Sequence, residues 1–120
     1  MAISLTGTGV TFDSGSLTTS YPGLGLSGQT WQSPGRALNT TYTNSTGRPI
    51  IVLICVRNQD RNNSYVANII SGNAVGGIGS NSATRDSIDV CFTMIVLNGQ
   101  TYSSNVQVGG PGLVYWYEFR

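Results

Sequence analysis

The sequence has no histidine and no lysine, and only 9% of its 120 residues are charged. Without histidine the chain lacks the usual general base and the commonest metal ligand, and without lysine it lacks Schiff-base and P-loop chemistry. Its acids are scattered, so no carboxylate pair suited to glycoside hydrolysis is evident. We therefore expect a non-enzymatic protein with no catalytic residue, no metal site and no cofactor. The acids are Asp13, Asp60, Asp86, Asp89 and Glu118.

Net charge and long apolar runs are lacking as well. The formal net charge is +1, so no attraction to nucleic acid is expected. Residues 1–10 have neither a basic start nor an uninterrupted apolar stretch, so we expect no signal peptide. The longest apolar run, residues 50–56, is too short to cross a bilayer, and no membrane insertion is expected. The charged fraction is far below the ~25% of an ordinary soluble domain, so neutral polar residues must supply solubility.

Helical periodicity is missing, and short β-branched or aromatic runs alternate with turns rich in glycine, serine and asparagine. Asn98-Gly99 predicts a two-residue hairpin, and residues 109–112 predict another turn. Short antiparallel strands at this spacing favour an all-β fold, a small β-sandwich or jelly roll. The predicted strands are 3–12, 29–32, 38–43, 49–57, 65–71, 87–97, 101–108 and 113–119.

Several predicted strands are apolar on both faces. Residues 50–56 leave no polar face, both faces of 113–119 are aromatic or apolar in the middle, and one face of 87–97 is an unbroken apolar row. A lone small sandwich has difficulty covering so many apolar faces, which favours an oligomer. The alternative is that these strands are central and are covered within one chain. The candidate subunit-interface residues are Ile51, Leu53, Tyr115 and Tyr117.

Polar loops are the best candidates for ligand binding. Residues 58–63 are consecutive polar residues between two predicted strands, and their amides, carboxylate and guanidinium can bind sugar hydroxyls. Tyr65 or Trp31 could supply the aromatic surface of a saccharide site. A second candidate is the long glycine-rich loop predicted over 72–86, although both segments could equally be plain solvated loops. The candidate ligand-binding residues are Asn58, Gln59, Asp60, Arg61, Asn62, Asn63, Tyr65, Arg85 and Asp86.

Three segments of the chain resemble one family. Residues 28–32 read Gly-Gln-Thr-Trp-Gln, Arg36-Ala37 follows, and residues 39–50 read Asn-Thr-Thr-Tyr-Thr-Asn-Ser-Thr-Gly-Arg-Pro-Ile. Residues 6–15 read Thr-Gly-Thr-Gly-Val-Thr-Phe-Asp-Ser-Gly, and residues 116–120 have the form Trp-x-Glu-x-Arg. These segments resemble the C-terminal tip domain of tailed-bacteriophage tail fibres and the stretch that often precedes it. The middle of the chain, 58–86, has no part in the resemblance.

The resemblance implies a homotrimeric, all-β virion part without catalysis, made in the host cytoplasm and carried in the tail fibre. Its partners would be copies of itself, other virion or tail proteins, and a bacterial surface receptor, with a glycan favoured over a protein. An alternative reading is a structural virion protein, such as a fibre connector, head fibre or decoration subunit, that binds other virion proteins. A third is a depolymerase fragment.

The sequence also predicts the domain organisation and the state of the two cysteines. Residues 1–27, rich in glycine, serine and threonine, are expected to form a lead or stalk-like segment, and residues 28–120 the sandwich domain. A disulfide between Cys55 and Cys91 would close a loop of about 36 residues and add about 3–4 kcal/mol. We expect two buried free thiols instead, because phage parts assemble in a reducing cytoplasm.

Overall fold

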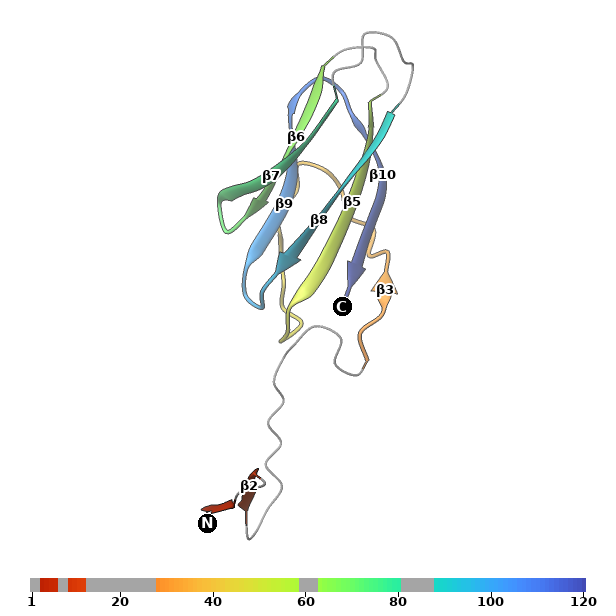
Figure 1. Ribbon diagram of the computed structural model, residues 1–120. Coiled ribbons are helices and arrows are strands. Elements are labelled where there is room, and N and C mark those ends of the chain that lie inside the picture. Colours follow the sequence, from red (N-terminus) through yellow and green to blue (C-terminus); the bar gives the residue numbers. More distant parts are fainter. Residues whose placement is uncertain (1–2, 7–8, 13–27, 59–62, 81–87) are drawn as a thin grey trace.

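The computed structural model describes residues 3–6, 9–12, 28–58, 63–80 and 88–120, and every regular element among them is a strand (Figure 1). Two short strands, β1 (Ile3–Thr6) and β2 (Gly9–Phe12), pair with each other in antiparallel register. The prediction of one continuous strand over 3–12 is therefore wrong. Glycines at positions 7 and 9 interrupt the run, and glycine in a strand interior favours a break or turn.

Eight further strands form two antiparallel sheets of four strands each, so the predicted all-β sandwich is confirmed. The strands are β3 (Trp31–Gln32), β4 (Tyr42–Thr43), β5 (Ile50–Asn58), β6 (Ser64–Ile70), β7 (Asn73–Ser80), β8 (Ile88–Val96), β9 (Thr101–Val108) and β10 (Gly112–Phe119). One sheet, here termed the β5 sheet, has the order β3-β10-β5-β8. The other, termed the β6 sheet, has the order β4-β9-β6-β7.

The chain passes from one sheet to the other at every connection between β3 and β10 except the one from β6 to β7. Strand β10 lies between β3 and β5, and β9 lies between β4 and β6. This strand order is that of an eight-stranded jelly roll, in which each sheet collects strands from distant parts of the chain. The two sheets face each other as the layers of a sandwich (Figure 1).

The turn at Asn98-Gly99 forms, but it does not make the predicted hairpin. The backbone N–H of Gln100 donates to the carbonyl of Leu97 at 3.1 Å, and Gly99 has φ +82°. The flanking strands nevertheless diverge, because β8 pairs with β5 in one sheet and β9 with β6 in the other. Turn residues specify a local chain reversal, whereas pairing partners are decided by the burial of whole strand faces.

Strand β7 lies in the region where the sequence predicts a loop over 72–86. Ser71 and Gly72, both with positive φ, form a two-residue turn that pairs β7 with β6. Glycine in β7 makes room for rings: a Cβ at Gly76 would overlap the ring of Phe92 in the core. The predicted loop is therefore wrong over 73–80, because close approach of a ring, rather than chain flexibility, accounts for glycine there.

Inward-facing side chains of both sheets form one core. The even positions of β8 point inward as the alternation predicts, with Met94 and Val96 buried and Phe92 packed against them. Trp116, on the inner face of β10, is buried as well. The buried apolar cluster consists of Ile50, Val52, Ile54, Val56, Val66, Ile78, Met94, Val96, Tyr102 and Trp116.

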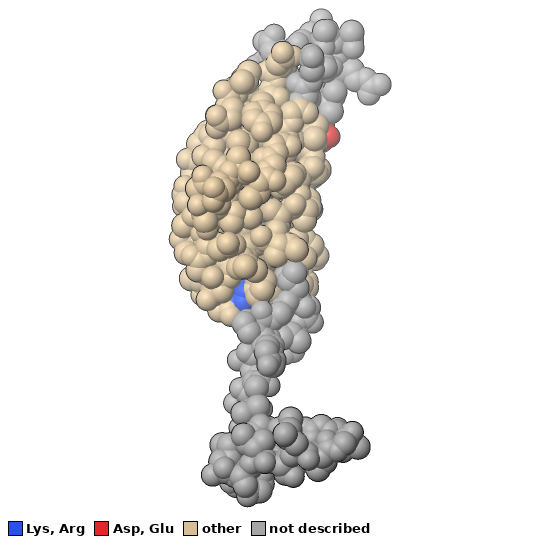
Figure 2. Space-filling view, turned by 60° about the vertical axis from the view of Figure 1, so that its left-hand side comes forward, with Lys and Arg blue, Asp and Glu red and all other residues tan. Residues whose placement is uncertain are grey.

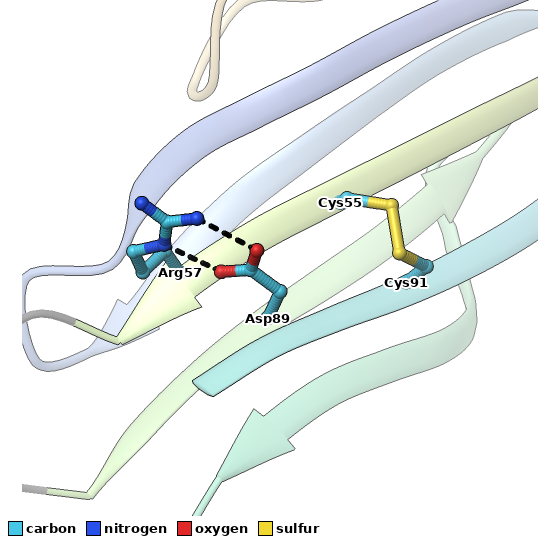
Figure 3. Close-up of a disulfide and its surroundings, with 4 residues drawn as sticks. All are labelled: Cys55, Arg57, Asp89 and Cys91. Carbon is cyan, nitrogen blue, oxygen red and sulfur yellow. Dashed lines mark hydrogen bonds and ion pairs between the residues drawn. A yellow bond between two sulfur atoms is a disulfide. The ribbon is translucent and has the colours of Figure 1, made fainter. Parts of the chain in front are cut away.

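Cys55 and Cys91 form a disulfide between β5 and β8, which corrects the expectation of free thiols (Figure 3). The two residues are directly paired across the strands and lie on the outer face of the β5 sheet. Directly opposed residues on one face of an antiparallel pair bring their Cβ atoms close together, so this register favours the bond. Because Cys91 is exposed, solvent oxidants and reductants can reach the bond.

Reduction of this disulfide is expected to destabilise the sandwich. The bond links residues separated by 36 positions, and in the chain-entropy model such a loop is worth about 3–4 kcal/mol. Thermal melts with and without a reducing agent should show a lower midpoint for the reduced protein. A variant with both Cys55→Ser and Cys91→Ser should melt like the reduced protein and should not respond to the reductant. Complete alkylation of both thiols in denatured, unreduced protein would contradict the assignment.

Candidate functional site

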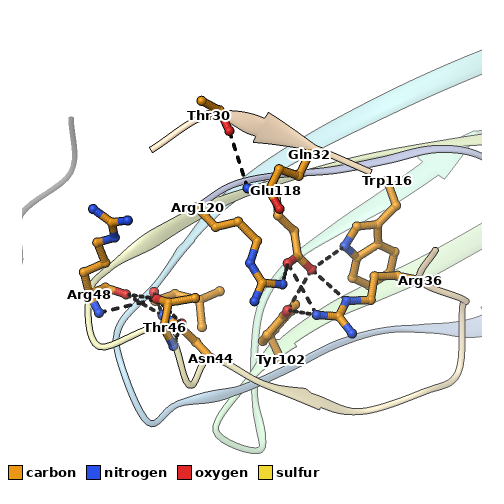
Figure 4. A network of polar contacts seen from close by, with 11 residues as sticks. Thr30, Gln32, Arg36, Asn44, Thr46, Arg48, Tyr102, Trp116, Glu118 and Arg120 are labelled. Carbon is orange, nitrogen blue, oxygen red and sulfur yellow. Dashed lines mark hydrogen bonds and ion pairs between the residues drawn. The ribbon is translucent and has the colours of Figure 1, made fainter. Parts of the chain in front are cut away.

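Glu118, on the inner face of β10, is the fully buried centre of a polar network (Figure 4). Tyr102 donates its hydroxyl to Oε1 at 2.7 Å, and the indole Nε1 of Trp116 donates to the same oxygen at 3.2 Å. Arg36 donates Nε to Oε1 at 3.0 Å, and Arg120 donates Nη1 to Oε2 at 2.9 Å. The carboxylate is therefore held between two guanidinium groups, and both of its oxygens accept hydrogen bonds.

Arg36 comes from the segment between β3 and β4 and fixes that segment to the core. Its guanidinium lies over the ring of Tyr42 at 4.2 Å from the ring centre, a cation–π contact, and its Nη2 donates to the Tyr102 hydroxyl at 3.4 Å. The Tyr42 hydroxyl in turn accepts the backbone N–H of Ala37 at 2.9 Å. One side chain therefore ties the connecting segment to both sheets.

The protonation states of this network follow from its contacts. Burial by itself raises the pKa of Glu118, but hydrogen bonds from Arg36, Tyr102 and Trp116 and the charge of Arg36 outweigh it, so the pKa is lowered. Burial, followed by the hydrogen bond to Glu118 and the charge of that group, raises the pKa of Tyr102. At neutral pH the carboxylate is thus ionised and the phenol protonated. Both pKa values move away from neutrality, and the arrangement serves as a structural clasp.

Asn44 fastens the two neighbouring turns. Its Nδ2 donates to the carbonyls of Arg48 and Val96 at 2.8 and 2.9 Å, and its Oδ1 accepts the backbone N–H and the hydroxyl of Thr46. Its own carbonyl accepts the N–H of Gly99 at 2.7 Å. Asn44 is 1% exposed, so a residue that reads as a plain turn former is part of the interior.

Residues 29–31 meet the end of β10 and the start of β5 at one end of the sandwich. Thr30 and Arg120 exchange both backbone hydrogen bonds at 3.1 Å, which closes β3 onto β10. Gln29 donates its side-chain amide to the carbonyl of Pro49 at 2.9 Å. We term this the proximal end, defined by Thr30, Arg120 and the turns 44–49 and 97–100; it lies at the bottom of the sandwich in Figure 1.

The sequence did not identify the Glu118–Arg36 pair as a unit, although it contains a signal for it. In β10, Trp116 and Glu118 share the inner face of a strand that is otherwise aromatic or apolar. A carboxylate on a buried face requires a cationic or hydrogen-bonding partner, so the pattern indicates that some arginine must reach it. Alternation does not say which of the six arginines does so, because Arg36 lies 82 positions away.

Three of the predicted ligand-binding residues are described, and they lie at the opposite, distal end of the sandwich. Asn58 is the last residue of β5, and Asn63 and Tyr65 are exposed at the start of β6. The strand ends Ser80 and Ile88 lie at this end as well, paired with Ser64 and Asn58. Gln59, Asp60, Arg61, Asn62, Arg85 and Asp86 lie outside the described residues.

The predicted interface residues lie together on the outer face of the β5 sheet. Tyr117 pairs with Leu53, and Phe119 pairs with Ile51 in the adjacent row. Tyr115 is 51% exposed and stacks on Tyr117 at 6.0 Å between ring centres. Trp31, proposed above as a sugar platform, belongs to the same face, where it packs on Phe119 at 5.4 Å. This outer aromatic face also includes the exposed Ile95, which pairs with Ile51.

The Glu118 network should make the sandwich sensitive to acid. The pKa of Glu118 is lower folded than unfolded, so its contribution to stability is present above the unfolded value of 4.5 and is lost as pH falls through the folded pKa. The pKa of Tyr102 is raised, so its contribution is lost as pH rises above its unfolded value of 10.0. Unfolding free energies measured across pH should fall on both sides of neutrality.

The variant Glu118→Gln should lose about 3 kcal/mol of stability at pH 7, because removing one member of a buried ion pair leaves the other charge uncompensated. It should also lose the part of the acid transition that Glu118 causes. The matched control is Asp89→Asn, which removes a carboxylate from the exposed pair with Arg57 and should cost much less. An equal loss of unfolding free energy in the two variants would show that the burial of Glu118 does not increase its contribution to stability.

Comparison with known proteins leaves the function to be inferred from these residues. No family model, curated protein or solved structure matches the chain. Within the described part of the chain, no helix is long and apolar enough to cross a membrane. Among the same residues, no three histidine, cysteine or acidic side chains gather as metal ligands would. The function is therefore inferred from the geometry of the chain's own residues.

Proposed function

We propose that this chain is the receptor-binding tip domain of a bacteriophage tail fibre and that it attaches the virion to a glycan on the bacterial surface. The observation that supports this most is the division of the sandwich into two unlike ends. The segments 28–50 and 116–120, which resemble fibre tips, meet in the proximal clasp, whereas the strand ends that flank the polar candidate segments lie at the distal end. A domain fastened at one end and polar at the other has the layout that a fibre tip requires.

The residues of the first candidate loop suit a neutral ligand rich in hydroxyl groups. Four of the six residues 58–63 are amides, and the remaining two, Asp60 and Arg61, carry opposite charges. Amides offer donors and acceptors side by side, which matches the dual character of a sugar hydroxyl. The loop has no net charge with which to select a strongly anionic or cationic polymer.

Self-association through the outer aromatic face of the β5 sheet is part of the proposal. Rows of paired residues run across this face, one of them from Trp31 through Phe119 and Ile51 to Ile95. Trp31 and Ile95 are 52% and 54% exposed, and exposed apolar patches of this kind mark interaction sites. The charged residues in register on this face, Arg57 and Asp89, neutralise each other at 2.6 Å (Figure 3). The resemblance to fibre tips supports three copies rather than two.

The purified protein should therefore have about three times the chain mass by light scattering or native mass spectrometry. Leu53→Asp places a charge in the middle of the outer face and should yield folded monomers, since an unpaired charge buried in an interface costs several kcal/mol. The control Gln107→Asp adds the same charge at an exposed position of β9, in the other sheet, and should remain trimeric. A monomeric wild-type protein at micromolar concentration, or a trimeric Leu53→Asp variant, would contradict the proposed interface.

Receptor binding is expected to depend on the polar loop. Replacing Asp60 and Arg61 together by Ala should change stability by less than about 1 kcal/mol, because the sequence gives neither residue an evident role in the core. It should weaken binding of the labelled protein to a susceptible bacterial strain by roughly tenfold or more, because one charge-assisted hydrogen bond is worth about 1.5–3 kcal/mol. Flow cytometry of the bacteria with labelled trimer measures the effect.

The matched control is Asn73→Ala, which removes an exposed polar side chain beside the turn between β6 and β7, away from both the loop and the outer face of the β5 sheet. This variant should bind the strain like the unchanged protein. Equal binding by the loop double variant and this control would exclude the loop from recognition. The exposed outer face also favours the alternative function of a structural virion protein, and that reading gains if the protein binds no bacterium yet binds purified fibre or capsid components.

A further inference from the structure

Tyr65 lies on the outer face of the β6 sheet, with its ring laid over the neighbouring strand β7. A Cβ at Gly77 would overlap the ring and the hydroxyl of Tyr65, and a Cβ at Gly79 would stand 3.3 Å from its Cδ2. The ring therefore covers the backbone of both glycines. Tyr65 is nevertheless 41% exposed, so the side of the ring that faces away from β7 is open to solvent.

The two glycines are explained by the ring and not by the backbone. Neither Gly77 nor Gly79 has a positive φ, so any residue could adopt the backbone conformation found at these two positions. They are paired with Ala67 and Tyr65 on the adjacent strand, which places them under and beside the aromatic ring. Any larger residue at Gly77 would lift the ring off the sheet.

The residues around this ring are neutral. Val108 pairs with Tyr65 on its other side, and Asn105 pairs with Ala67 one row further along the same face. Gln107 is exposed and lies in β9 between Asn105 and Val108, where the pairing with β6 shifts register. Asn63 is also exposed and precedes Tyr65 by two residues in the chain. Figure 2, which brings the β7 side forward, shows a described surface made almost entirely of uncharged residues.

We propose that the ring of Tyr65, supported by Gly77 and Gly79, is a stacking platform for the C–H face of a neutral pyranose, with the amides of Asn63, Asn105 and Gln107 around it. This inference rests on the proposed receptor-binding function, because it assigns the part of the site that holds a sugar ring. Of the two aromatic residues that the sequence offers for this surface, Tyr65 is favoured, because Trp31 packs on Phe119 on the outer face of the other sheet.

The chemistry of the platform favours a sugar over other ligands. An aromatic ring is negative on its face, and the hydrogens on the carbons of a pyranose are weakly positive, so the two surfaces attract when stacked. Side-chain amides can donate to and accept from the hydroxyls at the rim of such a sugar. A phosphate or carboxylate would find no cation among the described residues paired with or next to Tyr65 in the sheet.

The test uses the full chain labelled with 15N, titrated with two methyl glycosides. Methyl β-D-galactopyranoside presents a continuous C–H face, whereas methyl α-D-mannopyranoside carries an axial oxygen on each face. The galactoside should shift the amide resonances of Tyr65, Gly77 and Gly79 and should bind more tightly than the mannoside. Equal or absent responses to the two sugars would overturn the platform.

Four variants separate ring geometry from general stability. Tyr65→Ala should weaken galactoside binding by roughly tenfold, and Tyr65→Phe should stay within about twofold, because stacking uses the ring and not the hydroxyl. Gly77→Ala should weaken binding like Tyr65→Ala while leaving the melting temperature nearly unchanged, since the exposed ring can swing aside. Val75→Ala, an exposed position on the same strand, should have no effect on binding.

The outcomes for the platform and for the receptor function are distinguishable. If labelled trimer binds bacteria and neither Tyr65→Ala nor Gly77→Ala weakens that binding, the platform is wrong and the receptor function stands. If the trimer binds no strain in a broad panel and no glycoside, both are wrong. If Gly77→Ala binds the galactoside like the unchanged protein, the supporting role of the glycines is refuted.

Discussion

The buried carboxylate of Glu118 sets the condition under which this sandwich can close. A charge without access to water has to be compensated where it stands, and here Arg36, Tyr102, Trp116 and Arg120 provide the donors. These donors come from β9, β10 and the segments flanking β3 and β10, so the charge is satisfied only when both sheets have met. The same clasp joins the segment after β3 to the end of β10, which gives these distant residues a shared physical reason to occur together.

Strand identities were largely predictable from the sequence because β-branched alternation is a local property. The pattern in β8 placed Met94 and Val96 in the core, and the spans predicted for β5, β9 and β10 agree closely with the structure. Pairing was less accessible: the turn at Asn98-Gly99 joins two sheets, and nothing local distinguishes that from a hairpin. Strand β7 was missed because glycine was read as a loop signal.

The candidate site residues also divide into those that local alternation predicts and those that depend on pairing between distant strands. The alternation of residues along the strand placed Tyr115 and Tyr117 on the same face of β10. In the structure this face also includes Leu53 and Ile51 of the neighbouring strand β5. The contacts of Glu118 with Arg36 and of Tyr65 with Gly77 depend on register between distant strands, which hydrophobic pattern does not encode. The disulfide depends on register too, since Cys55 and Cys91 must lie directly opposite each other.

The position of β10 has a consequence for how the protein is made. This strand follows all the others in chain order, yet it lies inside its sheet, between β3 and β5. Until β10 leaves the ribosome, β3 has no partner and β5 presents an unsatisfied edge, so the nascent chain cannot complete the sheet by itself. Such non-local closure makes folding slow and leaves incomplete chains prone to aggregation. A complete β5 sheet is thereby restricted to chains whose synthesis has passed β10.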